Sequence, residues 1–257
     1  MASILERVRG HGNQPVIPSL PSPEGDDVFE EMTLQEHLEE LRTRILYSAI
    51  FVVIGFGIGL AVAMPVLRLM ARMSGLHDFV TISPMEGFTE FMKVGLYIGI
   101  GLSMPALVYQ LVRFLAPGLT RRERHYLYRA LPFVSILFLA GVAFAFFIVV
   151  PHALEFLSHF GGSVFTSQFR AQEVVSFYLK LLLGIGVVFE TPLIIFMLAK
   201  LGVVGPQRLS SLRKYMIVIS LVLAAVITPT PDPVNMFIVA APIYLLYELG
   251  VILARFA

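Results

Sequence analysis

Two carboxylates in basic surroundings are the residues of this sequence best suited to binding a cationic group. Glu123 lies in the stretch Thr120–Arg129, TRRERHYLYR, which contains four arginines. Glu40 precedes Arg44 by four residues, which is the spacing of an ion pair within one helix. Glu123 also follows Thr120 with the T-x-x-E spacing of a helix capping box. From the residues alone, local structural roles and the binding of cations from outside both stay open for Glu40 and Glu123.

A third carboxylate lies in apolar surroundings. Glu190 follows Phe177 by 13 residues and precedes Lys200 by 10, so on a helix it lies about 15–20 Å from either end of the apolar run. An acid near the middle of a bilayer costs about 2.5–3.5 kcal/mol to insert. Because Pro192 removes a backbone N–H, a protonated Glu190 bonded to a freed carbonyl is one interpretation, and a functional acid is the other. Gln110 is the other polar side chain deep in an apolar run.

The composition predicts that these residues are surrounded by a lipid bilayer. Apolar residues make up 57% of the 257 residues and charged residues 14%, with a mean hydropathy of +0.81. Soluble domains typically contain about 45–50% apolar residues and about 25% charged residues. The net charge of +1 gives no indication of nucleic-acid binding. Without cysteine there are no disulfides, thiolate metal sites or cysteine nucleophiles. The histidine spacing and the absence of hydrolase or nucleotide-binding loops predict no metal, no cofactor and no enzymatic activity.

Six apolar segments are predicted to cross the membrane, which makes the chain an all-α integral membrane protein. Their approximate limits are 45–63, 91–115, 130–150, 177–199, 215–227 and 234–253. The last two helices are expected to be short. The fifth covers about 20 Å against a hydrocarbon core of about 30 Å, and the sixth has only 13 residues between Asn235 and Glu248. We therefore predict that the bilayer is thin around this pair.

Other local signals set the limits of the helical domain. Residues 1–32 are rich in proline and then acidic, and are predicted to form a disordered cytoplasmic tail, which leaves 33–257 as the transmembrane domain. Thr33 and Glu36 have the spacing of a capping box at the start of the first helix. Two G-x-x-x-G pairs favour close helix packing: Gly55/Gly59 and Gly95/Gly99.

The distribution of lysine and arginine predicts the orientation. Six spans put both termini on one side, and most of the basic residues fall on that side, so both termini are expected in the cytoplasm. The cluster around Glu123 then lies in a short cytoplasmic loop. This explains the arginines of the cluster and leaves Glu123 without an explanation.

Three motifs occur in a characteristic order. The first is HLEELR at 37–42, the second is Pro117-Gly118-Leu119 followed by Glu123-Arg124, and the third is FETP at 189–192. Further matches are Thr228-Pro229 with Asp232, then Pro242 and Tyr247-Glu248. Together they resemble the TatC family, the polytopic core of the twin-arginine protein translocase, over about residues 33–255.

The resemblance implies a function. TatC proteins bind signal peptides with two consecutive arginines, on folded cargo, at the cytoplasmic face of the bacterial inner membrane. They associate with the single-span proteins TatA and TatB and with further copies of themselves, and the proton-motive force drives transport. By this resemblance Glu40 and Glu123 form the arginine-pair site, with Arg42 and Phe114 near it. The intramembrane polar residues are Glu190 and Gln110, and further structural or functional positions are Pro65, Pro105, Pro192 and Asp232.

The sequence departs from the family at two places and leaves one alternative function. Val112 stands where many relatives have Trp, and Asn235-Met236 where many have Ser-Gln. The alternative is a proton-coupled transporter of small solutes that uses Glu190 as its proton site. Such a transporter would be expected to have polar residues on several facing spans, whereas the deep polar residues here are Glu190 and Gln110. A membrane-embedded hydrolase would need a nucleophile–base pair at membrane depth, and the sequence shows no such pair.

Overall fold

The computed structural model describes residues 33–74, 80–118, 121–160, 169–200, 202–228 and 232–256. Nine α-helices occur in this part: α1 (Leu34–Met73), α2 (Glu86–Leu115), α3 (Arg121–Phe144), α4 (Val150–His159), α5 (Ala171–Val188), α6 (Thr191–Lys200), α7 (Pro206–Ser211), α8 (Arg213–Ile227) and α9 (Pro233–Ala254). The predicted tail at 1–32 and Thr120 of the second predicted capping box lie outside the described residues. So do the side chains of Arg121, Arg122, Glu123 and Leu127.

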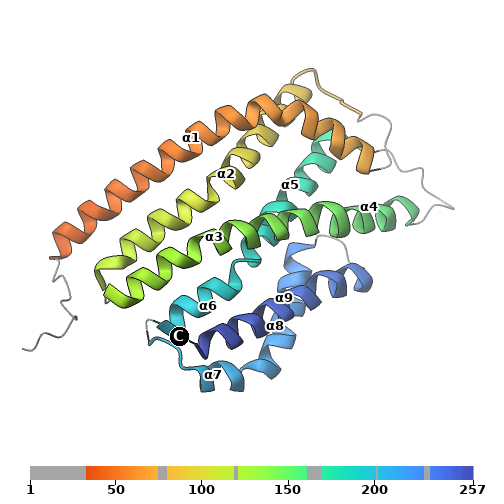
Figure 1. Ribbon diagram of the computed structural model, residues 1–257. Coiled ribbons are helices and arrows are strands. Elements are labelled where there is room, and N and C mark those ends of the chain that lie inside the picture. The colour runs from red at the N-terminus through yellow and green to blue at the C-terminus, as the bar shows by residue number, and fades with distance from the viewer. Residues whose placement is uncertain are drawn as a thin grey trace, which may run out of the picture.

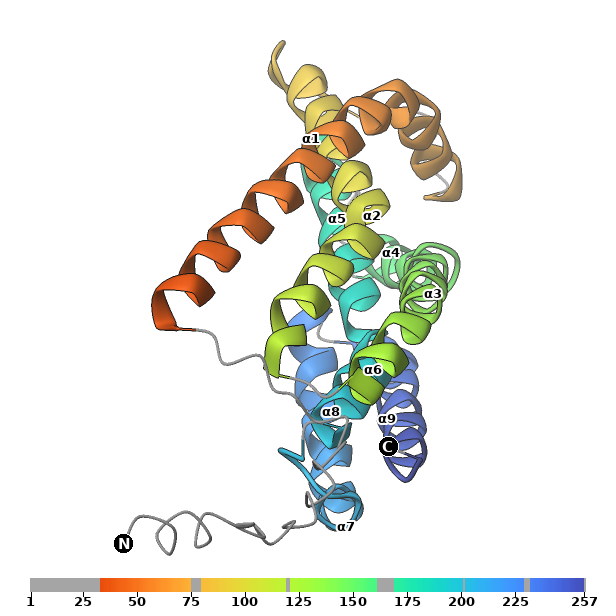
Figure 2. The ribbon, with the colours of Figure 1, turned by 60° about the vertical axis from the view of Figure 1, so that its left-hand side comes forward.

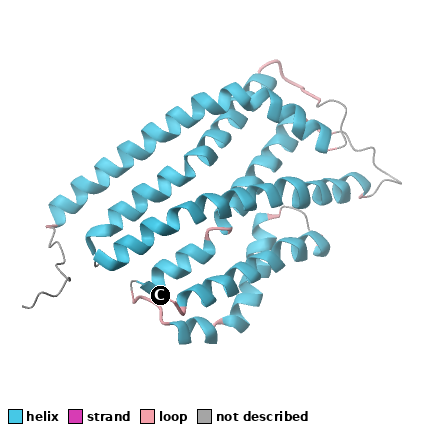
Figure 3. Cartoon of the chain, viewed as in Figure 1, coloured by secondary structure: helices cyan, strands magenta, loops and turns pink. Residues whose placement is uncertain are grey.

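The described part is helical apart from short connections (Figure 3). Helices α1 and α2 form an antiparallel pair, and α3 and α4 form one long rod that crosses beside α5 (Figures 1 and 2). Helices α6 and α8 both pack against α9. The start of α1, the ends of α2, α6 and α9, and helix α7 lie at one end of the molecule (Figure 1). We call it the basic end, after Arg113, Lys200, Arg208, Arg213 and Arg255, and the other the opposite end.

Five helical stretches of the described chain are long and apolar enough to cross a membrane. They are Leu34–Met73, Glu86–Leu115, Arg124–His159, Ala171–Lys200 and Pro233–Ala254, and each contains one predicted span. The predicted fifth span falls in α8, whose 15 residues make it the short helix that was expected. The all-helical membrane fold is therefore confirmed, and six crossings stay a prediction.

Helix α9 is not the short helix that was expected. It has 22 residues, close to the predicted limits 234–253, and the expectation that it would be short, based on the 13 residues between Asn235 and Glu248, is wrong. Glu248 accepts an ion pair from Arg213 at 2.8 Å and a hydrogen bond from the Tyr244 hydroxyl at 3.0 Å. Because this carboxylate is paired, it does not end the helix. The predicted shortfall in length therefore applies to α8 and not to α9.

The first two long helices touch at their glycines. A Cβ on Gly55 would lie 2.5 Å from the carbonyl oxygen of Gly99, and one on Gly59 would overlap the carbonyl of Gly95. The hydroxyl of Ser103 on α2 donates to the carbonyl of Phe51 on α1 at 2.8 Å. The predicted close packing at both G-x-x-x-G pairs is confirmed.

One turn of the α3–α4 rod is a π-helix, at Ala145–Val149. The N–H of Val150 donates to the carbonyl of Ala145, five residues back. Pro151 follows directly. In a regular helix its ring would clash with the carbonyl four residues before it, and a wider turn relieves that clash. The helical stretch therefore continues to His159, beyond the predicted limit at residue 150.

The main core lies between α1, α2, α5 and the π turn. Tyr178 is fully buried there, its hydroxyl lies 3.1 Å from that of Ser74, and it donates to the carbonyl of Met70 at 3.3 Å. A second cluster joins α6, α7 and α9 at the basic end, where the Tyr247 hydroxyl donates to the carbonyl of Leu209. A third cluster, centred on Val112 and Met197 with Tyr128 beside them, packs the end of α2 against α3 and α6, next to the predicted site.

Candidate functional site

Helix α1 begins with the predicted capping box. The Thr33 N–H donates to the Glu36 carboxylate at 2.8 Å, and the Glu36 N–H donates to the Thr33 hydroxyl at 3.3 Å. This reciprocal pair satisfies two N–H groups that have no partner inside the helix. The cap fixes where α1 starts and therefore which face of its next two turns carries the HLEELR residues.

Among the described residues, only one oxygen of the Glu40 carboxylate accepts hydrogen bonds. Its Oε1 accepts from Arg44 Nη2 at 2.8 Å and from Arg44 Nε at 3.3 Å, the ion pair that the spacing predicts. Its Oε2 is buried and has no hydrogen-bond partner among the described residues. The two side chains are 14% and 16% exposed, whereas Arg42 is exposed on another side of the helix. Glu40 therefore keeps a free acceptor oxygen beside a neighbouring cation.

An aromatic contact joins α1 to the end of α2 next to this carboxylate. The imidazole of His37 stacks on the ring of Phe114, with centroids 4.3 Å apart and an interplanar angle of 17°. His37 lies one turn before Glu40 on α1, and Phe114 lies one residue before the end of α2. The contact brings two predicted site elements together at the basic end, and the sequence gives no signal for the stacking.

Helix α3 starts immediately after this point. A 3₁₀ turn at Ala116–Gly118 follows α2, and the guanidinium of Arg124 donates to the carbonyl of Ala116 at 3.0 Å. Glu123 is the third residue of α3, so its backbone lies beside the turn. Its side chain is outside the described part, and the expected meeting of Glu40 and Glu123 stays a prediction.

Glu190 interrupts the fourth predicted span. Helix α5 ends at Val188 and α6 begins at Thr191, so Phe189 and Glu190 form a turn between two helices. Glu190 is 5% exposed, and neither carboxylate oxygen has a hydrogen-bond partner among the described residues. The ring of Phe189 packs on Gly141 and lies 5.7 Å from that of Phe144, which anchors the turn against α3.

The carbonyl freed by Pro192 is satisfied by a different side chain. In an unbroken helix the N–H of residue 192 would donate to the carbonyl of Val188, and proline has no such N–H. The Thr191 hydroxyl donates to that carbonyl instead. The interpretation in which Glu190 bonds to a freed carbonyl is therefore wrong, because its buried carboxyl group has no hydrogen-bond partner among the described residues.

The remaining predicted positions are separate from one another. Gln110 is 6% exposed on α2, and its Oε1 has no partner among the described residues. Pro65 and Pro105 lie inside α1 and α2, which continue through them. Asp232 caps α9 and accepts from the N–H groups of Val234 at 3.0 Å and Asn235 at 3.2 Å.

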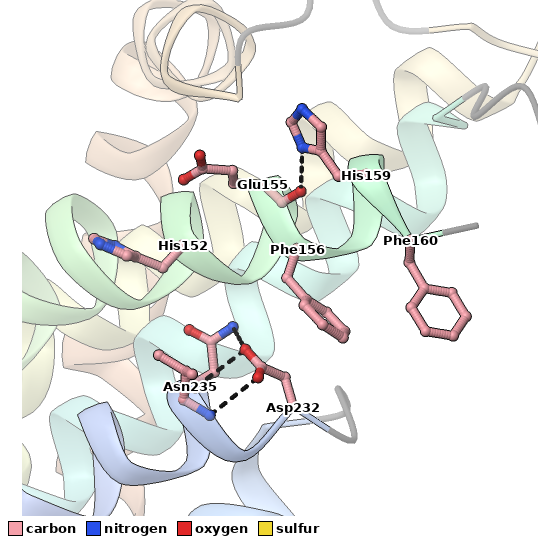
Figure 4. Close-up of a pocket in the computed structure, with 8 residues that line it drawn as sticks. His152, Glu155, Phe156, His159, Phe160, Asp232 and Asn235 are labelled. Carbon is pink, nitrogen blue, oxygen red and sulfur yellow. Dashed lines mark hydrogen bonds between the residues drawn. The ribbon is translucent and has the colours of Figure 1, made fainter. Parts of the chain in front are cut away.

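Asp232 also lines an open pocket at the opposite end. The pocket has a volume of about 620 Å³ and lies between α4 and the start of α9 (Figure 4). The Asp232 carboxylate accepts the side-chain amide of Asn235 at 2.9 Å. Phe156 extends from α4 toward this pair, and Phe160, the residue after α4, also lines the pocket (Figure 4). Nδ1 of His159 lies 2.8 Å from the backbone carbonyl of Glu155, so one nitrogen of this imidazole is hydrogen-bonded to its own helix.

Sequence reasoning missed two buried carboxylates on α2, Glu86 and Glu90. Glu90 pairs with Lys93 at 2.7 Å. The Glu86 side chain is 2% exposed, lies at the start of α2, and receives Arg170 from the segment before α5. The bond from Glu86 raises the pKa of the Arg170 guanidinium above its usual value. The two residues are 84 positions apart, so no local pattern could have paired them.

A family model described as Sec-independent protein translocase protein (TatC) matches residues 36–242. The chain belongs to the TatC family. The TatC protein of Carboxydothermus hydrogenoformans is 37% identical over 227 residues, which are 88% of this chain and 93% of that protein. The TatC protein of Aquifex aeolicus is 36% identical over 232 residues, 88% of this chain and 96% of that one.

Solved TatC structures share the fold. A crystal structure of the twin arginine translocase receptor TatC superposes with a TM-score of 0.71 at 35% identity, over 86% of this chain and 99% of that one. A second, in DDM, gives a TM-score of 0.74. The resemblance from the sequence motifs is confirmed, and the protein is a membrane-embedded component of a TatC-type protein translocase, a family of non-enzymatic proteins.

Proposed function

We propose that this chain receives twin-arginine signal peptides at its basic end, and that Glu40 binds one of the two arginines. The support is that Oε2 of Glu40 is buried and has no hydrogen-bond partner among the described residues. A buried acceptor without a partner costs about 1–3 kcal/mol, and an incoming guanidinium N–H removes that cost. Arginine suits the position because its planar fork can hydrogen-bond two acceptors at once, whereas lysine offers a point charge. Arg44 already binds Oε1, so the free Oε2 is the atom that would receive the ligand.

In this proposal Glu123 receives the second arginine, and Arg42 and Phe114 border the site. The start of α3 supports this, because the bond from Arg124 to Ala116 holds it beside the end of α2. The His37–Phe114 stack supports it from the other side, because it fixes α1 against α2 one turn from Glu40. Two charge-assisted contacts contribute about 3–6 kcal/mol, and micromolar affinity needs about 8, so the apolar part of the signal peptide contributes the remainder.

The wider setting follows from the family. We propose a six-span protein of the bacterial inner membrane with both termini in the cytoplasm, with α8 as the fifth span. It would assemble with single-span partners of the TatA and TatB type and with other copies of itself, and the proton-motive force would drive export. Membership of a translocase family does not favour the alternative of a proton-coupled solute transporter.

The binding proposal is tested with purified protein and two labelled signal peptides, one with Arg-Arg and one with Lys-Lys. Glu40→Gln and Glu123→Gln should each abolish the preference for Arg-Arg and leave weak binding that depends on the apolar segment. The double variant should lose less than the sum of the single losses if one arginine pair bridges both sites. Glu39→Gln is the matched control, because Glu39 is exposed on the same helix. Full Arg-Arg preference in both single variants would contradict the proposal.

A second experiment tests the orientation. Because the chain has no cysteine, single-cysteine variants report one position each. A membrane-impermeant maleimide added to intact spheroplasts should label Val80→Cys at the opposite end and should not label Arg255→Cys at the basic end. The reverse pattern would put both termini outside the cytoplasm.

A further inference from the structure

An ammonium group on α5 has no partner in the described part of the chain. Lys180 is exposed and lies nine residues after Ala171, so it is about 13 Å along the helix from its start at the opposite end. It makes no hydrogen bond or ion pair with a described residue. Lys93, by contrast, binds Glu90 at 2.7 Å, and Lys200 lies over the ring of Tyr126. A solitary cation this far along a membrane helix is expensive unless water or an anion reaches it.

The surroundings of Lys180 form a groove between α5 and α8 with a volume of about 630 Å³. Its lining from α5 recurs at helical spacing and therefore occupies one face of that helix. The lining residues are Gln172, Glu173, Ser176, Phe177, Lys180 and Gly184 from α5, with Val226 and Ile227 from α8. The groove is thus polar toward the opposite end and apolar where α8 meets it.

Helix α8 closes the inner end of the groove. A Cβ on Gly184 would lie 3.6 Å from Cγ2 of Ile227, which is the last residue of α8. Beyond this level the polar face of α5 has no neighbour from α8. The 15 residues of α8 cover about 22 Å, against a hydrocarbon core of about 30 Å. A bilayer that thins to match α8 brings its headgroup layer to the depth of Lys180, one turn from Gly184.

The two charges of the groove are opposite and lie at different depths. Glu173 is exposed near the start of α5, and Lys180 follows it by seven residues, or about 10 Å along the axis. This rise separates the two backbone positions, and both exposed side chains are long enough to turn toward a ligand that lies between them. A phosphate and a primary ammonium separated by two methylenes can then each make a charge-assisted hydrogen bond of about 2.8 Å. Val226, which is 77% exposed, offers an apolar surface next to it.

We propose that this groove binds one aminophospholipid, with its phosphate on Lys180 and its primary ammonium on Glu173. The charges of the groove balance those of a zwitterionic headgroup, whereas a purely anionic headgroup would meet the Glu173 carboxylate. The acyl chains would lie along Phe177, Val226 and Ile227. This assignment does not depend on the signal-peptide site, which lies at the basic end.

Native mass spectrometry tests the proposal on the purified full chain, in equal mixtures of phosphatidylethanolamine, phosphatidylcholine and phosphatidylglycerol. The wild type should retain one phosphatidylethanolamine in preference to the other two. Lys180→Gln should bind it about tenfold more weakly, as loss of one hydrogen bond to a charged group implies. Lys180→Arg should keep it. Glu173→Gln should shift the preference toward phosphatidylglycerol, because the repelling carboxylate is gone.

Lys214→Gln is the matched control, since it removes one exposed lysine from α8 at the basic end. It should bind like the wild type. Unchanged retention in Lys180→Gln would overturn the proposal, and so would an equal loss in Lys214→Gln. If phosphoethanolamine without acyl chains saturated the groove with the same affinity as the whole lipid, the assignment to a lipid would be overturned.

Accessibility gives an independent readout for variants that bind no lipid. In nanodiscs of neutral lipid, Ser176→Cys should react with an impermeant maleimide, because the groove admits water to that depth. Val187→Cys, which replaces a 45% exposed residue further along α5, should stay unlabelled. Protection of Ser176→Cys to the same extent as Val187→Cys would show that no polar groove exists there.

Discussion

The carboxylate of Glu86 binds the guanidinium of Arg170 through two hydrogen bonds, Oε1 to Nε at 3.0 Å and Oε2 to Nη2 at 3.2 Å. It also accepts the backbone N–H groups of Ile82 at 3.0 Å and Gln172 at 3.1 Å. Next to it, the N–H of Ala171 donates to the carbonyl of Val80 at 2.9 Å. One side chain thus fastens the segment before α2 to the segment before α5 at the opposite end.

Glu86→Gln should lower the thermal midpoint of the purified protein. Both oxygens of the carboxylate accept hydrogen bonds, whereas an amide offers one acceptor oxygen and a donor NH2 group. Arg170→Gln should lower the midpoint to a similar extent, and the double variant should lose little more than either single one, since both remove the same interaction. Glu155→Gln, at an exposed carboxylate on α4, is the control and should leave the midpoint unchanged. Additive losses in the double variant would mean that Glu86 and Arg170 act independently.

Gly59→Ala should separate α1 from α2. Its methyl group would overlap the carbonyl of Gly95, and overpacking of this kind costs about 1–3 kcal/mol. Gly57→Ala, two residues earlier, meets nothing within 4 Å and is the matched control, because it adds the same methyl group to the same helix. Resistance to unfolding by SDS measures both. Equal resistance in the two variants would show that the close approach is not required for stability.

Glu190→Leu should make the protein more resistant to unfolding while abolishing export. Replacing a buried acid that has no partner among the described residues by an apolar side chain removes a cost of about 1–3 kcal/mol, so stability and activity should change in opposite directions. Export of a folded twin-arginine substrate by cells measures activity. Glu190→Gln then separates two roles: if it exports, the group acts by hydrogen bonding, and if it fails as Glu190→Leu does, the ionisable group itself is needed. Wild-type export by Glu190→Leu would remove Glu190 from the mechanism.

A single-span partner should contact α8. Its 15 residues are too few for a hydrocarbon core of about 30 Å, and a mismatched helix recruits neighbours or thins the bilayer. Val218 and Val222 are exposed on α8 and should crosslink to the partner from single photoreactive positions. Phe133 and Ile136, exposed on α3, are the comparison positions. Crosslinks confined to α3 would contradict the prediction.

Local patterns in the sequence predict the local parts of the structure well. The Thr33–Glu36 cap and the Glu40–Arg44 pair each depend on residues a few positions apart on one helix, and both are present. The G-x-x-x-G spacing within each helix likewise predicted a close helix contact, which is present at Gly55 and Gly59. The apolar segments are predictable for the same reason, because exclusion of charge over a span is a property of a continuous stretch.

Contacts between distant segments were not predictable in this way. Nothing near Glu86 indicates Arg170, and nothing in HLEELR indicates that His37 stacks on Phe114. The limits of α9 were predicted closely, but it was expected to be short because Glu248 counts as a charge in the sequence, whereas in the structure Arg213 pairs with it. Glu190 was recognised as unusual, but the Thr191 hydroxyl that satisfies the nearby carbonyl depends on how the turn is formed.

The π turn at Ala145–Val149 sets the rotational phase of α4 relative to α3. A π turn accommodates one residue more than the helix around it, and one residue corresponds to about 100° of rotation about the axis. Without that residue the rod would be a regular helix, and every side chain of α4 would face about 100° away from its present direction. Phe156 would then no longer face Asp232 across the pocket (Figure 4). The wide turn therefore works as an angular offset that aims one half of a long helix independently of the other.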